Sequence, residues 1–455
     1  MTEFGGKIVA YLSYRYINDG KSELMLNQVQ ELALYELKKK EMNGQYVFEE
    51  WNCDCGIPFS ELITIAGKDR YGLHIQTKIC PRCGMLMTNP RMTQESYNEF
   101  YDSEYRRLYV GKEVAGEIYF EKQYNRGRLI ADFLSRQGAL IAVESVLEIG
   151  CSAGGILQYF KDTGKKIKGI DLGSEYINYG ISRGLEIECG NSKDLLQKPD
   201  KYDLIILHHV FEHFLDIISE LGVIKKLLSP KGLLFIAVPG IKSIPDVYMG
   251  NALRYLQNAH IRHFTLSTLK QVMKQNGYTC IAGDESIMSI FKYDGNISQS
   301  IKNYYEQVMG DLKTYETSFL ETADDEIKQY QEACNKLSNI IYVQQQLLNK
   351  NRNGKLVENW LLEHNINKIA IYGMGVLGEQ LMKELANSNI EVLYVVDKRK
   401  LEIESVESYF PEDRLPKVDC VILTTVSQYA EIEAVLGKFN DDMKIYSLAK
   451  ILSDI

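Results

Sequence analysis

The 455-residue sequence predicts an α/β protein with two units of alternating strands and helices, a cysteine-rich lobe before them and a helical segment between them. Three observations lead to this prediction. Short Val/Ile/Leu strands alternate with helical stretches from 145 to 293, the alternation returns after 366, and no strand pattern occurs from 297 to 363. We therefore expect five parts, with the boundaries 1–50, 51–100, 101–295, 296–364 and 365–455.

Composition and charge narrow the class of protein. Hydrophobic residues make up 45% and charged residues 25%, values typical of a soluble globular protein. The net charge of -9 argues against a nucleic-acid partner held by a broad basic surface. No apolar run approaches the roughly 18 residues that span a bilayer, and the N-terminus lacks a signal-peptide layout. We expect a cytoplasmic protein without a membrane span.

The first part, 1–50, is expected to hold an amphipathic helix that Ser22 caps and that ends near Asn43-Gly44. The second part carries two cysteine pairs, Cys53-Asp-Cys55 and Cys80-Pro-Arg-Cys83, separated by 24 residues. Four thiolates make a closed tetrahedral Zn²⁺ site, so the metal is expected to stabilise a small lobe and to take no part in catalysis. Thiols without metal are the alternative.

The third part begins with the most informative stretch. Residues 147–155 read Leu-Glu-Ile-Gly-Cys-Ser-Ala-Gly-Gly, and Lys168-Gly-Ile-Asp171 ends the next predicted strand. A strand, a small-residue turn, a helix and a second strand ending in a carboxylate describe a nucleotide-cofactor pocket, in which Asp171 can hold two ribose hydroxyls. The turn reads Glu-x-Gly-x-Ser-x-Gly, which differs from the pyrophosphate-binding Gly-x-Gly-x-x-Gly. It favours S-adenosylmethionine (SAM) over NAD.

This stretch resembles motif I of class I SAM-dependent methyltransferases, and the resemblance continues into Tyr202–His208 and Phe211-Glu212-His213. It implies a class I methyltransferase Rossmann-like sheet for the third part. Asn191 stands where the family commonly has an acid that contacts the adenine amine, and helix capping is the alternative role for Asp171. The expected cofactor-binding residues are Glu148, Gly150, Ser152, Gly154, Asp171, Asn191 and His208.

The acceptor side is predicted from histidines that follow the fourth and fifth strands. The segment His260-Ile-Arg-His263-Phe-Thr resembles the one after strand five in this family. With a four-cysteine lobe before it and an α/β domain after it, the layout resembles bacterial sugar C-methyltransferases that act on nucleotide-linked keto-sugars. The resemblance implies that His260 removes a proton beside a ketone to give an enolate, and His213 is expected to face the acceptor.

Two departures weaken the link to C-methylation. Ala259 stands where those enzymes typically have a Glu, and Gln257 replaces an expected Tyr. Methylation of a sugar hydroxyl therefore stays open, as does a structural role for His260. In either case we expect a sugar or nucleotide-sugar acceptor in cell-surface polysaccharide or secondary-metabolite biosynthesis.

The fifth part contains a second glycine-rich loop. Lys368-Ile-Ala-Ile-Tyr precedes a complete Gly-x-Gly-x-x-Gly, and Asp397 lies 24 residues after the first glycine. The expected second nucleotide site, for a nucleotide or NAD, is Gly373, Gly375, Gly378 and Asp397. It leaves open an NAD(P)-dependent sugar-modifying oxidoreductase or a non-catalytic nucleotide-binding scaffold. Only about 90 residues remain here, too few for a separate substrate domain.

The fourth part predicts a long helix. Its apolar residues follow a 3-4 spacing, which suits packing on the same chain or a helix pair that joins two copies through 327–348. The stripe consists of Ile327, Tyr330, Cys334, Leu337, Ile341 and Leu348.

Overall fold

The structure is a computed structural model that describes residues 2–4, 7–111, 116–197, 200–322, 325–354, 356–401, 403, 406–426, 429–437 and 444–455. The chain forms two compact units. The first comprises 1–24, 41–105 and 112–323, and the second comprises 25–40, 106–111 and 324–455. The five-part division made from the sequence stays a prediction.

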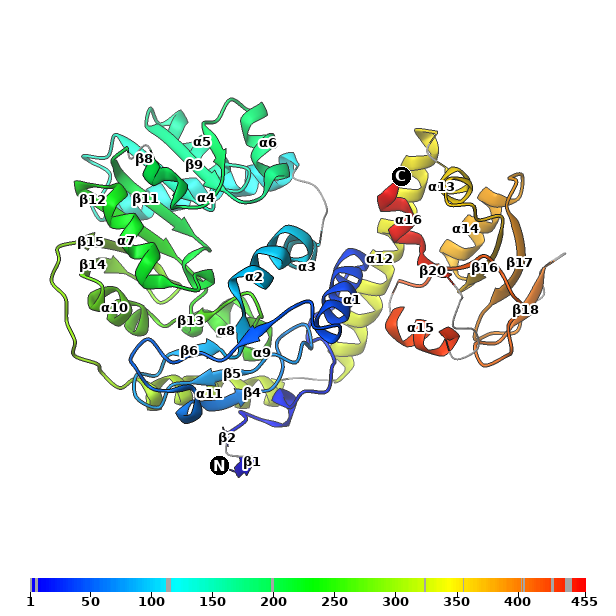
Figure 1. The fold of residues 1–455 in the computed structure, drawn as a ribbon, viewed down its shortest axis with the longest axis horizontal. Helices are drawn as coiled ribbons and strands as arrows, with labels where there is room; N and C mark the ends of the chain where they lie inside the picture. The colour runs from blue at the N-terminus through cyan, green and yellow to red at the C-terminus, as the bar shows by residue number, and fades with distance from the viewer. Residues whose placement is uncertain are drawn as a thin grey trace. The chain divides into compact units, whose positions relative to one another are not determined.

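A seven-stranded sheet forms the centre of the first unit, in the order β10-β9-β8-β11-β12-β15-β14 (Figure 1). Its first five strands run parallel, and β15 runs antiparallel to both of its neighbours, β12 and β14. The strands are β8 (Ser145–Ile149), β9 (Lys166–Asp171), β10 (Ile187–Cys189), β11 (Tyr202–His208), β12 (Leu228–Ala237), β14 (Tyr278–Gly283) and β15 (Met288–Tyr293).

Helices cover both faces of this sheet because alternate strand residues are apolar on each side. Val146 and Leu204 pack with α4 (Glu117–Arg136), α5 (Gly155–Asp162) and α6 (Ser174–Ser182). Leu147 and Ile205 pack in a second core with α7 (Ile217–Leu227) and α10 (Leu266–Gln275). The loops at the carboxyl ends of the parallel strands lie at the edge of the sheet where ligands of such sheets bind.

The cysteine lobe is built on a second sheet, ordered β1-β2-β4-β5-β6-β13. Its last strand, β13, comes from the segment after β12 and pairs antiparallel with β6, so the lobe holds part of the chain that follows the fifth strand. The strands are β1 (Thr2–Phe4), β2 (Lys7–Val9), β4 (Ile63–Ala66), β5 (Thr77–Ile79), β6 (Leu86–Thr88) and β13 (Arg262–His263), with β3 (Phe48–Glu49) and β7 (Arg91–Met92) paired separately.

Ten further helices of the described residues complete the first unit. They are η1 (Tyr14–Tyr16), η2 (Phe59–Glu61), α2 (Gln94–Phe100), the π-helix η3 (Tyr101–Tyr105), η4 (Asp194–Gln197), η5 (Phe211–His213), η6 (Ile241–Ser243), α8 (Ile244–Val247), α9 (Ala252–Tyr255) and α11 (Tyr305–Thr322). Among the described helices of the protein, none has both the length and the apolar character needed to cross a membrane.

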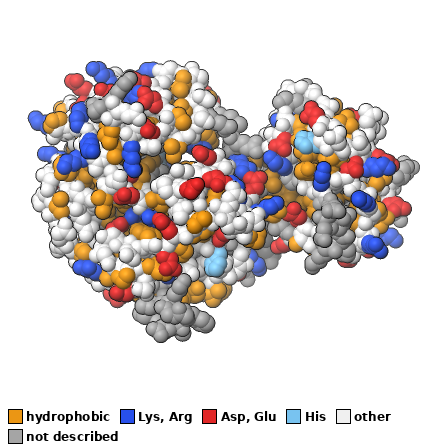
Figure 2. Space-filling view, viewed as in Figure 1, with side chains coloured by type: hydrophobic (Ala, Val, Ile, Leu, Met, Phe, Trp, Pro, Cys, Tyr) orange, Lys and Arg blue, Asp and Glu red, His pale blue; other side chains and the backbone are white. Residues whose placement is uncertain are grey.

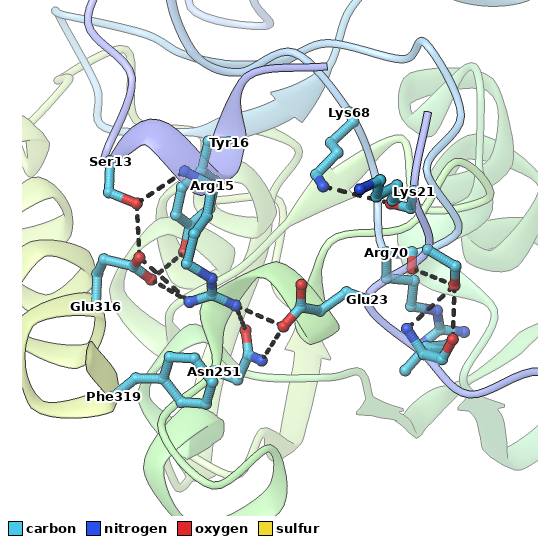
Figure 3. A network of polar contacts seen from close by, with 12 residues as sticks. Ser13, Arg15, Tyr16, Lys21, Glu23, Lys68, Arg70, Asn251, Glu316 and Phe319 are labelled. Atoms are coloured by element: carbon cyan, nitrogen blue, oxygen red, sulfur yellow. Dashed lines mark hydrogen bonds and ion pairs between the residues drawn. The ribbon is translucent and has the colours of Figure 1, made fainter. Parts of the chain in front are cut away.

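A buried ionic network ties the N-terminal segment to α11 (Figure 3). The Arg15 guanidinium donates to both carboxylate oxygens of Glu316 at 3.2 and 3.0 Å, and to Glu23 at 2.5 Å. Tyr16 Oη donates to Glu316 at 2.9 Å, and Asn251 joins Arg15 at 3.0 Å. These contacts satisfy a buried carboxylate and a buried guanidinium together, so the network has a structural role.

The second unit has a five-stranded parallel sheet, ordered β18-β17-β16-β19-β20. Helix α1, which was predicted as a separate N-terminal segment, belongs to this unit over most of its length and begins at Gln28, six residues after the expected Ser22 cap. The strands are β16 (Lys368–Tyr372), β17 (Glu391–Val396), β18 (Glu407–Tyr409), β19 (Cys420–Leu423) and β20 (Lys444–Ser447). The helices are α1 (Gln28–Met42), α3 (Arg106–Val110), α12 (Asp325–Arg352), α13 (Val357–Glu363), α14 (Val376–Leu385), α15 (Tyr429–Gly437) and α16 (Leu448–Asp454).

Within the described residues, the predicted apolar stripe of the helical segment is largely exposed. Leu337 and Ile341 are 59% and 46% exposed, whereas Val343 and Leu347 of the same helix are buried. The residues selected from the 3-4 spacing lie on a different face of the helix from the buried one. The buried face carries Val343 and Leu347, which pack in the core of the C-terminal unit. The side chains of Ile327 and Tyr330 lie outside the described residues.

Candidate active site

The loop after β8 adopts left-handed backbone angles at three of its small residues. The φ angles are 75° at Gly150, 51° at Ser152 and 78° at Gly154. A Cβ on Gly150 would lie 2.4 Å from Cγ2 of Val210, so only glycine fits the turn that brings the backbone to the ends of β8 and β11. Helix α5 starts immediately after Gly154, so its N-terminus lies at the loop.

Asp171 fixes this loop to the next strand. Its two carboxylate oxygens accept hydrogen bonds from the backbone N–H of Ser152 and of Gly173, both at 2.8 Å. The side chain is buried at the carboxyl end of β9. The structure therefore brings Asp171 to the glycine-rich loop, where the sequence predicted a ribose contact.

Glu148 is a buried carboxyl group beside the same loop. It is 1% exposed, and its Oε2 has no hydrogen-bond partner among the described residues. Burial raises the pKa of Glu148 well above its usual range, and the charge of Asp171 raises it further. An unsatisfied buried carboxyl is costly, so a cationic group such as the ammonium of SAM fits this position.

The remaining predicted cofactor residues lie around the same sheet edge. His208 ends β11, which pairs with β8, and it is half-buried; burial holds its pKa well below the usual range. Asn191 follows β10, is exposed, and its Oδ1 already accepts the backbone N–H of Lys193 at 2.9 Å. An amide oxygen has a second lone pair, so this bond does not prevent another contact.

Five of the seven histidines lie at the end of β11 or on the segments that follow β11 and β12, and three of them surround one carboxylate. Glu212 is 1% exposed, and its Oε1 lies 3.4 Å from His209 Nδ1, 3.9 Å from His213 Nε2 and 3.8 Å from His260 Nε2. The rings of His213 and His260 have centroids 5.0 Å apart. The two predicted catalytic histidines are thus brought together, with a carboxylate between them.

Residues of the α9–β13 segment and of α2 orient these imidazoles. His213 Nδ1 lies 2.8 Å from the carbonyl oxygen of Ala259, which also accepts from Tyr97 Oη at 2.7 Å. The side chain of Gln257 contacts His260 Nε2 and accepts from Arg70 Nη2 at 2.5 Å. The two positions at which the sequence departs from the sugar C-methyltransferases therefore both contact the histidine cluster.

The cysteine lobe holds the same segment in place. Thr88 Oγ1, at the end of β6, donates to the carbonyl oxygen of His260 at 2.6 Å, and Thr88 N donates to the carbonyl oxygen of Ile261 at 3.1 Å. These bonds continue the β6–β13 pairing, so the conformation of the predicted base depends on the lobe.

The electrostatics of the cluster favour neutral imidazoles. Burial lowers the pKa of His260 well below its usual range and also lowers that of His213, where the charge of Glu212 opposes the effect. Burial lowers the pKa of His263 to about 3, and neither of its ring nitrogens has a hydrogen-bond partner within the described ranges. A neutral imidazole can accept a proton, which is what a general base must do.

The four predicted cysteine ligands converge on one point. Cys53 Sγ and Cys83 Sγ lie 3.5 Å apart, as do Cys55 Sγ and Cys80 Sγ. All four sulfurs lie within 4.8 Å of one another. Zn–S bonds of about 2.3 Å in a tetrahedron put sulfurs about 3.8 Å apart, so the four thiols fit one metal ion of this kind.

The second glycine-rich loop, in the C-terminal unit, holds its own carboxylate. Met374 N donates to Asp397 Oδ2 at 2.8 Å, and Arg399 Nε donates to Asp397 Oδ1 at 3.0 Å. Burial alone would raise the pKa of Asp397, but the Arg399 bonds hold it below the usual range. Gly373 has a φ of 98° and a Cβ on Gly378 would lie 2.2 Å from Gly373 O, so both positions require glycine. Gly375 precedes α14, and a Cβ there would meet nothing within 4 Å.

Two site residues received no role in the sequence analysis. Glu212 was part of the Phe211-Glu212-His213 resemblance, and its position directly after a buried strand was the available signal. Arg70 lies 187 residues before Gln257 in the chain, and nothing in its local sequence connects it to the histidines.

Comparison with known proteins shows which family the central sheet resembles. Residues 121–282 match the family described as "Methyltransferase domain". This part of the chain is similar to a methyltransferase domain. Its seven-stranded sheet, with the antiparallel pair at β14 and β15, confirms the predicted class I methyltransferase Rossmann-like fold, and the domain supports SAM as the cofactor.

Two curated relatives show how far the likeness extends. The ubiquinone biosynthesis O-methyltransferase of Aeromonas salmonicida is 27% identical over 144 residues, which is 30% of this chain and 59% of that protein. The C-methyltransferase NovU of Streptomyces niveus is 24% identical over 155 residues, or 33% of this chain and 36% of that protein. This chain thus spans little more than half of the first relative and about a third of the second.

Solved structures give a similar result. A SAM-dependent methyltransferase from Archaeoglobus fulgidus aligns with a TM-score of 0.30 and 20% identity, covering 36% of this chain and 75% of that one. The plantazolicin methyltransferase BamL, solved with S-adenosylhomocysteine (SAH), aligns with a TM-score of 0.31 and 21% identity, covering 46% and 82%.

Proposed function

We propose that this protein transfers the methyl group of SAM to a sugar or nucleotide-linked sugar, with C-methylation through an enolate favoured over O-methylation. The observation that carries the proposal is the placement of His260 and His213 in one buried cluster, on segments that follow β11 and β12 of the sheet whose β8 loop is proposed to bind SAM. Sugar biosynthesis for cell-surface polysaccharide or secondary metabolites, and a cytoplasmic location, belong to the same proposal.

The cofactor set proposed for SAM is the loop and carboxylates described above. Glu148 would hold the ammonium group, and Gly150, Ser152 and Gly154 would let the backbone approach the methionine portion. Asp171 would take the ribose hydroxyls, Asn191 the adenine amine, and His208 the methionine end. When bound, SAM supplies an electrophilic methyl group.

His260 is proposed as the base. As a neutral imidazole it can accept the proton that lies beside a ketone, or the proton of a hydroxyl, while the acceptor is methylated. His213 is proposed to face the acceptor. Its Nδ1–H would donate to the Ala259 carbonyl, which would leave Nε2 free to accept a hydrogen bond.

Zn²⁺ is proposed at Cys53, Cys55, Cys80 and Cys83, with a structural role. Four sulfur ligands leave no position for a substrate, and the lobe positions the His260 segment through Thr88. The role of this metal in the reaction would therefore be indirect.

A nucleotide or NAD is proposed at Gly373, Gly375, Gly378 and Asp397. The buried amide of Gln28 supports a polar ligand here: its Nε2 lies 3.3 Å from the carbonyl oxygen of Thr425, next to Gly373, and its Oε1 has no partner in the described parts of the chain. Arg399 would have to release Asp397 before a ribose could use that carboxylate. Pairing of two copies through 327–348 stays a prediction.

Turnover separates these roles. We expect a nucleotide-linked 4-keto sugar to be methylated by the wild-type protein, and His260→Ala to lose that activity while its SAH affinity stays unchanged. Nuclear magnetic resonance of the product distinguishes a new C–CH₃ from an O–CH₃ group. Unchanged turnover in His260→Ala would remove His260 from the base role.

A further inference from the structure

The Glu212 carboxylate occupies an unusual position. It lies in η5, the three-residue helix after β11, and the carbonyl of Glu212 accepts the backbone N–H of Ile261 at 2.9 Å. That bond fixes Glu212 to the residue directly after His260. The carboxylate therefore has a defined position relative to the proposed base.

Charge around this carboxylate is mainly positive or neutral. His209 and His213 face it from its own segment, His260 from the α9–β13 segment, and Arg70 acts on His260 from the cysteine lobe. Burial raises the pKa values of Tyr97, Tyr101 and Tyr255, and the negative charge of Glu212 raises them further by a smaller amount. Glu212 Oε2 has no hydrogen-bond donor among the residues that the structure describes.

We propose that Glu212 is a positioning residue that stabilises the protonated imidazole formed when His260 takes the acceptor proton. The proposal rests on the proposed methyl transfer, but its first test below needs no acceptor.

The charge balance of the reaction calls for such a group. An acceptor C–H or O–H bond breaks and its proton forms a bond to the imidazole nitrogen. The acceptor's electron pair forms the bond to the methyl carbon, and the carbon–sulfur bond of the sulfonium breaks with its electrons going to sulfur. One positive charge thus leaves sulfur and appears on a buried imidazole, where Arg70 disfavours it and Glu212, 3.8 Å away, favours it.

This role also accounts for the departure at Ala259. The related sugar C-methyltransferases typically carry a Glu at that position, one residue before the proposed base. Here Ala259 uses its carbonyl to hold His213 and Tyr97, and the carboxylate nearest to His260 comes from a different segment of the chain.

The first experiment measures histidine titration by nuclear magnetic resonance in protein labelled at its seven histidines. Glu212→Gln keeps the shape and removes the charge. We expect it to lower the pKa of His213, of His260 or of both by about one pH unit or more, since an opposite charge at such distances shifts a pKa by roughly one to three units. Glu144→Gln removes an exposed charge before β8 and should leave both unchanged.

The second experiment uses the nucleotide-linked 4-keto sugar that the wild-type protein methylates. Glu212→Gln should lower kcat by about 10²-fold and move the acidic limb of the pH profile to lower pH, with KM and SAH affinity within about three-fold of wild type. Glu212→Asp keeps the charge farther from the imidazoles and should give intermediate values in both experiments. It keeps the proposal testable if Glu212→Gln does not fold.

Three outcomes would overturn the proposal. Histidine titrations unchanged in Glu212→Gln would remove the electrostatic coupling. Equal losses of kcat and SAH affinity would indicate a structural role. A second equivalent of zinc in the wild-type protein that is lost in Glu212→Gln would make the cluster a metal site. Absence of SAH binding in the wild type would instead refute the methyltransferase proposal, and the titrations would still decide the role of Glu212.

Discussion

The two glycine-rich loops of this chain have the same local design and different chemistry. In each, the N–H of a loop residue donates to the carboxylate that ends the next strand, from Ser152 to Asp171 and from Met374 to Asp397, both at 2.8 Å. Two residues before the first glycine, however, β8 carries the buried carboxyl of Glu148 and β16 carries the buried Ile371. The first loop thus has an acid ready for a cation, whereas the second has an apolar side chain there.

The carboxylate at the end of the second strand differs as well. Arg399 binds Asp397 through both its backbone N–H and its guanidinium. In a loop whose sequence matches the dinucleotide fingerprint, the acidic residue expected to bind ribose can therefore be bonded to a neighbouring arginine instead. The comparison teaches that the residues flanking such a loop indicate its ligand better than its glycines do.

The largest expected effect is on the thermal stability of the first unit, which carries the first glycine-rich loop. Cys53→Ser should abolish stoichiometric zinc binding and lower the thermal transition of the first unit by about 10 °C, because a metal bound only by the folded lobe contributes to its stability. Cys334→Ser, at an exposed position of α12, is the matched control and should change neither value. Metal analysis with calorimetry measures both; a fully stable Cys53→Ser protein would rule out structural zinc.

Glu148→Gln tests the first loop directly. The variant keeps the shape but loses the charge that we propose for the SAM ammonium, so its SAH dissociation constant should rise roughly 30-fold, the usual worth of a hydrogen bond to a charged group. Asp397→Asn makes the same kind of change at the second loop and should leave SAH binding unchanged. Equal affinities for wild type and Glu148→Gln would contradict the difference between the loops.

His263 lies in β13 of the first unit and tests how a buried imidazole affects the pH dependence of stability. Its folded-state pKa of about 3 lies below the ordinary value, so its contribution to stability is present above about pH 6.5 and is lost as the pH falls toward 3. Between pH 7 and pH 5 the wild type should lose about 2 kcal/mol from this residue alone. His263→Phe should lack that loss in urea unfolding, and parallel pH profiles for both proteins would contradict the assignment.

The smallest effect concerns the second loop. Arg399→Ala frees Asp397, and because Arg399 is exposed the substitution should not change the thermal midpoint measurably. NAD(H) affinity, measured by fluorescence titration, should rise about five-fold relative to wild type. A decrease would show that Arg399 itself binds the ligand, and the two loops would then differ less than their carboxylates suggest.

Much of the fold followed from local pattern. The strands β8, β9 and β11 have continuous apolar runs bounded by small or acidic residues, so their positions could be read directly, and the four cysteines were close enough in sequence to be paired. Acidic and basic side chains are interspersed on the face shown in Figure 2. This agrees with the net charge of -9, which argues against a broad basic surface.

Contacts between distant segments could not be read in this way. The joining of α1 to the C-terminal unit, the pairing of β13 with β6, and the Arg70–Gln257 contact each depend on tertiary packing. The exposed Leu337 and Ile341 show the same limit, since a 3-4 spacing predicts a helix but does not fix which face is buried. The roles of the individual site residues stay predictions.

The most direct measurement of the central claim is isothermal titration calorimetry of the wild-type protein with SAH, alongside NAD(H). We predict one SAH site per chain with a dissociation constant of tens of micromolar or tighter, which Glu148→Gln weakens and Asp397→Asn does not. Absence of SAH binding in that range, or SAH binding that depends on Asp397, would contradict the assignment of SAM to the first loop.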